Sequence, residues 1–277
     1  MQMNTENTQD NSNDRWQIGD VNLHSRLLLG SAGYPSPQTL GEAMAAAATE
    51  VVTVGLKRSL GAAGDNGFVA HALQQARAQG AHLLPNTAGC RTAREAINLA
   101  CMARELYDTT WIKLEVIGDE HTLQPDPFEL LVAATELARL GFTVLPYCTE
   151  DLVLCRRLLD AGCPLLMPWG APIGSGQGLV NLAGLRSLRA RLPTATLIID
   201  AGLGAPSQAA QALELGFDAV LLNSAVAQAR DPVRMAGAFR DAVRAGREAY
   251  VAGLMAPQDF AQPSTPVSGH AFLLGSV

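Results

Sequence analysis

The sequence is poor in aromatic residues and has no long apolar run. Phe, Trp and Tyr make up 5% of its 277 residues while 48% are apolar, so the core must consist mainly of Ala, Leu and Val. No apolar stretch approaches the roughly 20 residues that a membrane helix needs. Residues 1–14 are polar and acidic and lack the apolar stretch of a signal peptide. We therefore expect a cytoplasmic protein with a disordered tail over residues 1–14.

Paired cysteines and clustered basic residues are also missing. The five Cys form no CxxC pair and the five His have no ligand spacing, so we predict neither a disulfide framework nor a metal site, in a reducing compartment. The formal net charge is -6 without a basic run, so we expect no nucleic-acid or membrane partner. Of 20 basic residues only Lys57 and Lys113 are lysines, which makes each a candidate for amine chemistry.

What the sequence does contain is a regular alternation of short apolar runs with longer Ala- and Leu-rich helical patterns. Such continuous apolar runs are typical of parallel strands covered on both faces. Glycines stand where the predicted helices end, at 80, 141, 162 and 216, as in a left-handed helix cap. Strands are predicted at 26–31, 51–56, 81–85, 111–117, 142–147, 164–168, 194–200 and 219–223, and helices at 35–48, 68–79, 92–107, 127–140, 151–161, 179–192, 206–215 and 231–251.

Eight such βα units predict an α/β protein with one domain, a closed (β/α)8 TIM barrel over residues 15–255 with a C-terminal extension over 256–277. A doubly wound open sheet is the alternative, and the absence of a G-x-G-x-x-G turn after the first strand argues against it. In such barrels the active site lies at the C-terminal ends of the strands, so polar residues there are the candidates for function.

The fourth predicted strand carries two charged residues, Lys113 and Glu115. Side chains alternate along a strand, so both point the same way, and two charges are tolerable inside the barrel near its mouth but costly against the helix layer. A partly desolvated lysine loses proton affinity and attacks carbonyl groups to form Schiff bases, with Glu115 placed to move protons. The alternative is a buried ion pair without chemistry.

Further candidates follow the later strands. Asp200 ends the seventh strand and precedes a Gly-rich turn and Pro206, a combination suited to acid–base chemistry and anion binding. Asn223 and Ser224 end the eighth strand, where barrels of this fold often bind phosphate. The loop after the sixth strand holds four glycines between 170 and 178, which indicates either a backbone wrapped around a ligand or a flexible surface loop.

Other strand-end residues are weaker candidates. Lys57 is the rival amine, but it has no carboxylate two residues away. Asn86 and Thr87 end the third strand and could hydrogen-bond a substrate. Cys148 ends the fifth strand without a visible base, so we interpret it as a packing residue.

Several segments together resemble bacterial thiazole synthases of the thiamine pathway. Their joint occurrence in this order is specific, whereas ordinary barrel features would not indicate this activity. The polar tail, the Gly/Ala-rich stretch 59–66 and the segment after Val251 match that family poorly. The matching segments are residues 83–96, 111–115, 124–127, 141–148, 167–179, 198–225 and 231–243.

The resemblance implies a (β/α)8 enzyme that condenses 1-deoxy-D-xylulose 5-phosphate, dehydroglycine and sulfur, without a cofactor. Sulfur would arrive as the C-terminal thiocarboxylate of a ubiquitin-like carrier protein, and the enzyme would be a homo-oligomer, with a tetramer expected. The family's Schiff-base lysine falls on Lys113 and its acid–base carboxylates on Glu115 and Asp200. Its sugar-phosphate contacts fall on Gly174, Ala201, Gly202, Asn223 and Ser224.

Two rival functions remain open at this point. The first is a Schiff-base aldolase-type sugar-phosphate lyase on the same barrel, which would use Lys113 and the phosphate loops but need no protein partner. The second is a barrel that only binds the carrier or a metabolite. Lys113, Glu115 and Asp200 argue against the second, because a non-catalytic protein need not keep an amine between acids.

Overall fold

The fold is a closed barrel of eight parallel strands, seen here in a computed structural model that describes residues 14–56, 66–262 and 264. The strand order around the barrel is β10-β3-β4-β5-β6-β7-β8-β9, which confirms the predicted (β/α)8 class. The strands are β3 (Leu27–Gly30), β4 (Val51–Gly55), β5 (His82–Asn86), β6 (Trp111–Leu114), β7 (Thr143–Cys148), β8 (Leu165–Pro168), β9 (Thr196–Asp200) and β10 (Ala219–Leu222).

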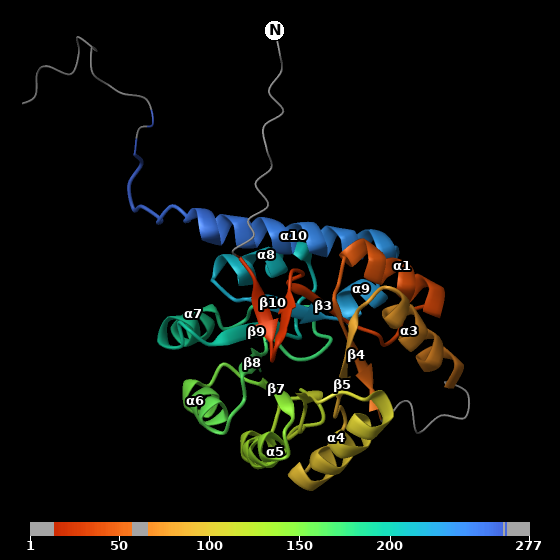
Figure 1. Cartoon of the computed structure of the whole chain (residues 1–277). Helices are drawn as coiled ribbons and strands as arrows, with labels where there is room; N and C mark the ends of the chain where they lie inside the picture. Colours follow the sequence, from red (N-terminus) through yellow and green to blue (C-terminus); the bar gives the residue numbers. More distant parts are fainter. Residues whose placement is uncertain (1–13, 57–65, 263, 265–277) are drawn as a thin grey trace, which may run out of the picture.

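Helices surround the barrel (Figure 1). Most begin at a side-chain cap: Ser36, Asp126 and Asp151 each accept a hydrogen bond from a backbone N–H in the first turn of their helix, as expected of N-cap residues. The helices are α1 (Pro37–Ala47), α3 (Asn66–Ala78), α4 (Ala93–Tyr107), α5 (Pro127–Arg139), α6 (Leu152–Asp160), α7 (Leu182–Arg191), α8 (Pro206–Glu214), the short α9 (Ser224–Ala227) and α10 (Pro232–Ala252).

The four glycines predicted to end helices all adopt positive φ angles. The values are 71° at Gly80, 80° at Gly141, 96° at Gly162 and 87° at Gly216. Only glycine enters this region without a steric penalty. The predicted left-handed caps are therefore confirmed.

Two element boundaries differ from the predictions for identifiable reasons. Helix α7 begins at Leu182, because Asn181 caps it by accepting a hydrogen bond from Gly184 N at 2.9 Å. Strand β6 ends at Leu114 instead of Ile117, because the main chain of Glu115 is bonded to a threonine side chain and not to a neighbouring strand. Periodicity alone detects neither event.

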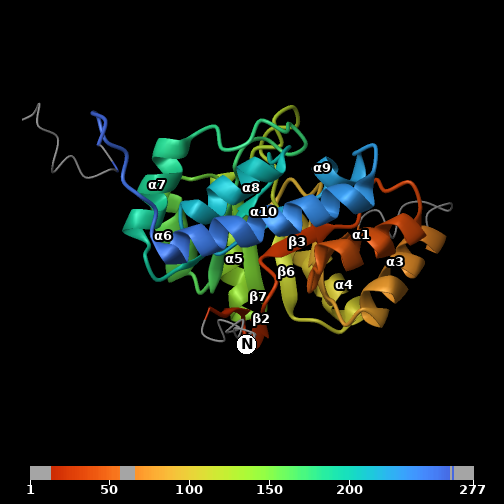
Figure 2. The same cartoon turned by 90° about the horizontal axis from the view of Figure 1, so that it is seen from above.

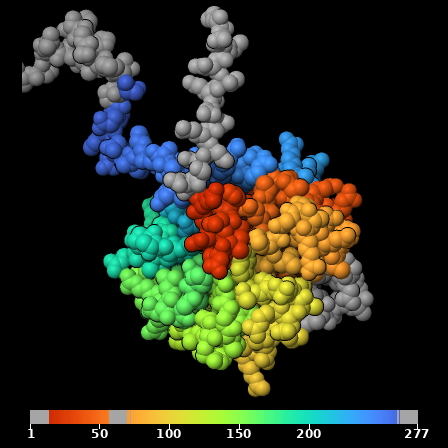
Figure 3. Space-filling model, viewed as in Figure 1, coloured from red at the N-terminus to blue at the C-terminus, as the bar shows by residue number. Residues whose placement is uncertain are grey.

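A hairpin at the N-terminus, β1 (Trp16–Ile18) with β2 (Val21–Leu23), was not predicted. The two strands pair antiparallel, and Figures 1 and 3 show them at the centre of the ring of helices, over the end of the barrel opposite the strand C-termini. Trp16, Ile18 and Leu23 are buried in one cluster with interior barrel residues such as Leu145 and Ile198. The hairpin thus closes the base of the barrel.

A second apolar layer lies between the strands and the helices. Figure 2 shows α10 lying along one side of the molecule, across α1 and α8. Gly246 of α10 lies so close to Ala210 of α8 that a Cβ atom on Gly246 would collide with the main chain of Ala210.

Within the described part of the chain, no helix is both long and apolar enough to span a membrane.

The predicted terminal segments lie largely outside the described residues. Residues 1–13 of the expected tail and most of the segment 256–277 belong there, as do Lys57 and most of the stretch 59–66. Asp14 is described, and its carboxylate pairs with Arg26 at 2.9 Å.

Candidate active site

Lys113, Glu115 and Asp200 meet inside the mouth of the barrel. The Nζ atom of Lys113 lies 2.7 Å from Oδ2 of Asp200 and 3.2 Å from Oε1 of Glu115. All three residues are buried, with 6%, 5% and 1% of the surface of Lys113, Glu115 and Asp200 exposed. The predicted pair of inward charges, one on β6 and one directly after it, and the predicted carboxylate at the end of β9 therefore lie together.

Their electrostatics differ from the expectation that burial makes Lys113 a weaker base. Burial does act to lower the pKa of Lys113, but the carboxylates of Asp200 and Glu115 outweigh it and raise that pKa above its ordinary value. Burial raises the pKa of Asp200 to about 6, against the opposing effect of Lys113. The resting lysine is thus an ammonium ion, and the ionised Asp200 carboxylate is the acceptor nearest to its proton.

Tyr147 lies beside this cluster, a residue that sequence reasoning missed. The Lys113 Nζ atom is 5.7 Å from the centre of the Tyr147 ring. The ring is fully buried, and its hydroxyl has no hydrogen-bond partner within the described residues. Burial, together with the carboxylates of Asp200 and Glu115, raises the pKa of Tyr147, so the phenol is neutral. Its position as the last residue of the fifth predicted strand, 142–147, is the signal that could have found it.

One cavity of about 1020 Å³ opens at the C-terminal ends of the strands. Its wall holds Lys113, Glu115 and Asp200 together with backbone-rich segments from three later loops. The five residues expected to contact phosphate all line it or its rim: Gly174, Ala201, Gly202, Asn223 and Ser224. Asn86, at the end of β5, also lines the cavity and is the register partner of Lys113.

The glycine-rich loop 170–178 is packed against the turn after β9. Gly178 N donates to Gly202 O at 2.8 Å, and Gly170 N donates to Ala201 O at 3.2 Å. Gly202 has a φ of 80°, and a Cβ atom there would collide with Ala171. The two ends of the loop are therefore packed against the turn after β9, and the expectation that its backbone wraps a ligand stays a prediction.

Some amides of this wall are open to a ligand and others are used. Gly174 N and Gly202 N donate to no acceptor within the described residues, so they can bind an anion. Gln208 Oε1 instead accepts from Gly204 N at 2.7 Å and from Ala205 N at 3.0 Å. The amides of Gly204 and Ala205 are therefore already bound by Gln208, whereas Gly174 and Gly202 line the cavity with their amides unbound.

A side-chain network holds the start of the same loop. Trp169 Nε1 donates to Glu150 Oε2 at 2.8 Å, and Asn181 Nδ2 donates to Glu150 Oε1 at 2.6 Å. The Trp169 main chain forms a parallel bridge with Asp200. Glu150 thus ties together both ends of the loop that flanks Asp200.

Cys148 faces away from the cavity. It lies in the apolar layer between strands and helices, with its Sγ atom 3.9 Å from Sγ of Cys155. The contact with Cys155 and burial raise the pKa of the Cys148 thiol well above its usual range, which fits packing better than nucleophilic chemistry. No group of three or more His, Cys, Asp or Glu among the described residues has the arrangement of a metal site.

Fold and site together define an enzyme of the (β/α)8-barrel class with a lysine between two acids in a deep cavity. A family model, described as Thiazole biosynthesis protein ThiG, matches residues 17–266. The chain belongs to this family, and it is an enzyme of thiazole synthesis.

Individual relatives agree with the family model over nearly the whole chain. A thiazole synthase of Coxiella burnetii (strain RSA 493 / Nine Mile phase I) is 58% identical over 259 residues, which cover 94% of this chain and 98% of the relative. A thiazole synthase of Gluconobacter oxydans (strain 621H) is 61% identical over 253 residues, covering 91% and 98%. These relatives favour thiazole synthesis over the sugar-phosphate lyase.

A solved relative also shares the fold. The structure described as the Amycolatopsis orientalis BexX/CysO complex contains a chain 30% identical to this one, with a TM-score of 0.78. The match covers 88% of this chain and 98% of that one.

Proposed function

We propose that this enzyme forms the thiazole phosphate ring through an imine between Lys113 and the ketone of 1-deoxy-D-xylulose 5-phosphate. The observation that carries the proposal is the placement of Lys113 Nζ within 3.2 Å of two buried carboxylates at the floor of the cavity. An amine that must lose a proton, attack a ketone and expel water needs acid–base groups at this distance.

Asp200 takes the first proton in this mechanism. Its pKa of about 6 makes it ionised at neutral pH, and its contact with Lys113 Nζ at 2.7 Å makes it the acceptor of the ammonium proton as the amine attacks. The free amine adds to the ketone carbon, and a proton returned to the carbinolamine oxygen lets water leave as the C=N bond forms. Glu115, on the other side of the amine, carries the protons for the tautomerisation that moves the carbonyl function along the sugar chain.

The phosphate group of the substrate is held by backbone in this proposal. Gly174 N and Gly202 N supply open donors, and Ala201, Asn223 and Ser224 complete the wall. Asn223 Oδ1 is buried without a partner among the described residues, so the amide is available to a ligand. Neutral amides suit a phosphate beside a cluster that has two carboxylates and one cation, because they add no further charge to the site.

Sulfur is delivered by a protein partner in the proposed reaction. The chain resembles a barrel whose structure was solved in a complex with CysO, and its cavity opens to the surface beside the glycine-rich loop. The carrier's thiocarboxylate sulfur adds to the carbonyl carbon exposed by the tautomerisation. The bond between this sulfur and the carrier's terminal carbonyl carbon then breaks, and the carrier leaves as a carboxylate that carries the former sugar oxygen. Dehydroglycine closes the ring with loss of water, and its nitrogen displaces the amine of Lys113.

The setting of the enzyme is part of the proposal. Five free cysteines fit a reducing cytoplasm. We also propose a homo-oligomer, as the family resemblance implies, with four subunits. Light scattering on the purified protein measures the mass directly, and a monomer would contradict it.

The decisive experiment is borohydride reduction with 1-deoxy-D-xylulose 5-phosphate, followed by intact mass spectrometry. Borohydride makes an imine permanent, so the wild type should gain the mass of one reduced pentulose phosphate. Lys113→Arg keeps a cation between the carboxylates but cannot form an imine, and it should gain nothing. Lys57→Ala is the matched control and should react like the wild type.

Two outcomes would contradict the proposal. An adduct that survives in Lys113→Arg and is lost in Lys57→Ala would move the nucleophile to Lys57. A shorter remnant on Lys113, from cleavage of the sugar chain, would instead favour the lyase.

A further inference from the structure

Thr87 holds the main chain of Glu115 with a single hydroxyl. Its Oγ1 donates to Glu115 O at 2.8 Å and accepts from Glu115 N at 2.8 Å. The Thr87 side chain is fully buried, so water does not compete for these bonds. Both main-chain hydrogen bonds of one acid–base residue therefore depend on one side chain.

The reason lies in how β5 and β6 separate. Their register pairs Asn86 with Lys113, and the next ladder bond runs from Thr87 N to Lys113 O at 3.1 Å. Beyond this point Thr87 O accepts from Cys90 N at 3.1 Å in a turn, and Glu115 N donates to the Thr87 hydroxyl instead of to Thr87 O as in a continuing parallel ladder. The Thr87 hydroxyl instead accepts from Glu115 N and donates to Glu115 O, while the chain after β5 turns away from β6.

This turn opens the wall of the cavity next to the lysine. Asn86, Ala88 and Gly89 line the cavity at the position where β5 leaves β6. Glu115 comes directly after the last residue of β6 and would otherwise lack ladder support on this side. Because β5 and β6 separate where the cavity opens, the Glu115 carboxylate needs another interaction to hold it in place.

We propose that Thr87 is a positioning residue that keeps the Glu115 carboxylate against Lys113 Nζ. Its importance for catalysis rests on the proposed function, whereas its coupling to Lys113 does not. The groups that face the amine are Glu115 after β6, Asp200 at the end of β9 and the neutral ring of Tyr147 on β7. Of these groups, only Glu115 is hydrogen-bonded by the Thr87 hydroxyl.

The test measures how readily Lys113 reacts with trace acetic anhydride at pH 8, relative to Lys57 in the same molecule, by peptide mass spectrometry. Only the unprotonated amine reacts, and an adjacent carboxylate keeps Lys113 protonated. Thr87→Val keeps the side-chain shape but removes the hydroxyl, so the Lys113/Lys57 ratio should rise about tenfold, as for the loss of one nearby opposite charge. Thr87→Ser keeps the hydroxyl and should stay near the wild-type ratio.

A double-variant cycle separates coupling from loosened packing. Glu115→Gln alone should also raise the ratio about tenfold, and adding Thr87→Val to it should change the ratio little, because the two changes act through the same carboxylate. Thr49→Val is the matched control at the other end of the barrel, where a buried threonine hydroxyl donates to Leu27 O at 2.6 Å. It should leave the ratio unchanged.

Equal ratios in wild type and Thr87→Val, or a further tenfold rise on the Glu115→Gln background, would overturn the inference. If Thr87→Val does not fold, as judged by circular dichroism, Thr87→Ala carries the same comparison. Borohydride trapping on the same variants tests the catalytic consequence: Thr87→Val should slow adduct formation at saturating substrate without weakening substrate binding. A wild type that forms no adduct would count against the proposed function and leave the labelling result standing.

Discussion

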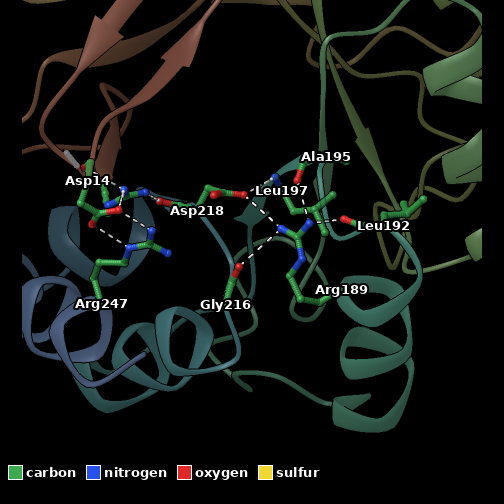
Figure 4. A network of polar contacts seen from close by, with 9 residues as sticks. Asp14, Arg189, Leu192, Ala195, Leu197, Gly216, Asp218 and Arg247 are labelled. Carbon is green, nitrogen blue, oxygen red and sulfur yellow. Dashed lines mark hydrogen bonds and ion pairs between the residues drawn. The ribbon is translucent and has the colours of Figure 1, made fainter. Parts of the chain in front are cut away.

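The barrel contains two charge clusters, a buried one at its mouth and a partly buried one at its base, and they are built from different cations. At the mouth a lysine, Lys113, faces Asp200 and Glu115 beside an open cavity. At the base the cations are arginines, and Figure 4 shows Arg189 and Arg247 among carboxylates and main-chain carbonyls. Only two of the 20 basic residues are lysines, so the presence of a lysine at the mouth, where the base has arginines, points to a different role for the mouth cluster.

The base cluster is held by many directed hydrogen bonds. Arg189 pairs with Asp218 at 3.2 Å and donates to the carbonyls of Leu192 and Ala195. Arg26, which is buried, donates to Asp218 O at 2.6 Å and pairs with Asp14. Guanidinium groups do not give up their proton in proteins, so this cluster joins segments without changing its charge.

The mouth cluster has fewer partners and groups that exchange protons. Lys113 can lose a proton and Asp200, with a pKa of about 6, can take it. An ion pair in this barrel therefore keeps its charge and joins segments where arginine supplies the cation, and it can exchange protons where lysine does. Substitutions on the two sides should separate stability from chemistry.

The largest effect on chemistry is expected from Asp200→Asn. The amide cannot accept the proton of Lys113, so adduct formation with 1-deoxy-D-xylulose 5-phosphate should slow by about 10²–10⁴-fold, the usual contribution of a positioned acid–base group. Quenched-flow borohydride trapping measures the rate. A rate within threefold of wild type would remove Asp200 from the proton transfer.

The opposite pattern is expected from Arg26→Met at the base. Loss of the guanidinium leaves Asp218 O without this donor, while Asp14 keeps its pair with Arg247, so the free energy of unfolding should fall by about 1–3 kcal/mol, as when a buried polar group loses its partner. Urea unfolding followed by circular dichroism gives this value. The folded fraction should still form the adduct at the wild-type rate, and a slower rate would show that the two clusters are coupled.

A substitution in the backbone wall should act mainly on phosphate binding. Gly202→Ala places a methyl group against Ala171 at a φ of 80°, so loop 170–178 must move and substrate binding should weaken at least tenfold, about 1.4 kcal/mol. Isothermal titration with the substrate measures the dissociation constant. Gly80→Ala is the control, because it has a similar φ of 71° with open space around it and should leave binding unchanged.

The most specific effect is the pH dependence of the two clusters, which is small near neutral pH. The Asp200 carboxylate that accepts the proton is present above pH 6 and lost below it, so trapping should slow about tenfold for each pH unit below 6. Ion pairs and hydrogen bonds, chiefly with Arg247, lower the pKa of Asp14 from 3.8. Its stabilising contribution is therefore complete above pH 3.8 and lost only as the pH falls through that lowered value. Between pH 4 and 8 the trapping rate should therefore fall on the acid side, whereas the stabilising contribution of Asp14 should stay constant. A parallel fall of the trapping rate and of that contribution would contradict the distinction between the two clusters.

Much of the fold could be predicted from local pattern. The eight barrel strands and their helices follow from apolar periodicity, and the ends of several helices from glycines whose positive φ angles the structure bears out. The hairpin β1–β2 was missed, because two strands of three residues have no periodicity of their own and gain their stability by covering the barrel interior. The same limit hid α9, a helix of four residues.

By itself the sequence determined which residues stand at the strand ends and which way they point, because alternation along a strand is a local property. It therefore placed Lys113, Glu115 and Asp200 at one mouth. Only the tertiary structure decided that Asp200 lies 2.7 Å from the lysine, that the ammonium form is favoured over the free amine, and that the Thr87 hydroxyl supports Glu115. The physical reason is that Coulomb energies and hydrogen bonds depend on distances of a few ångströms, and barrel closure sets these distances between residues far apart in the chain.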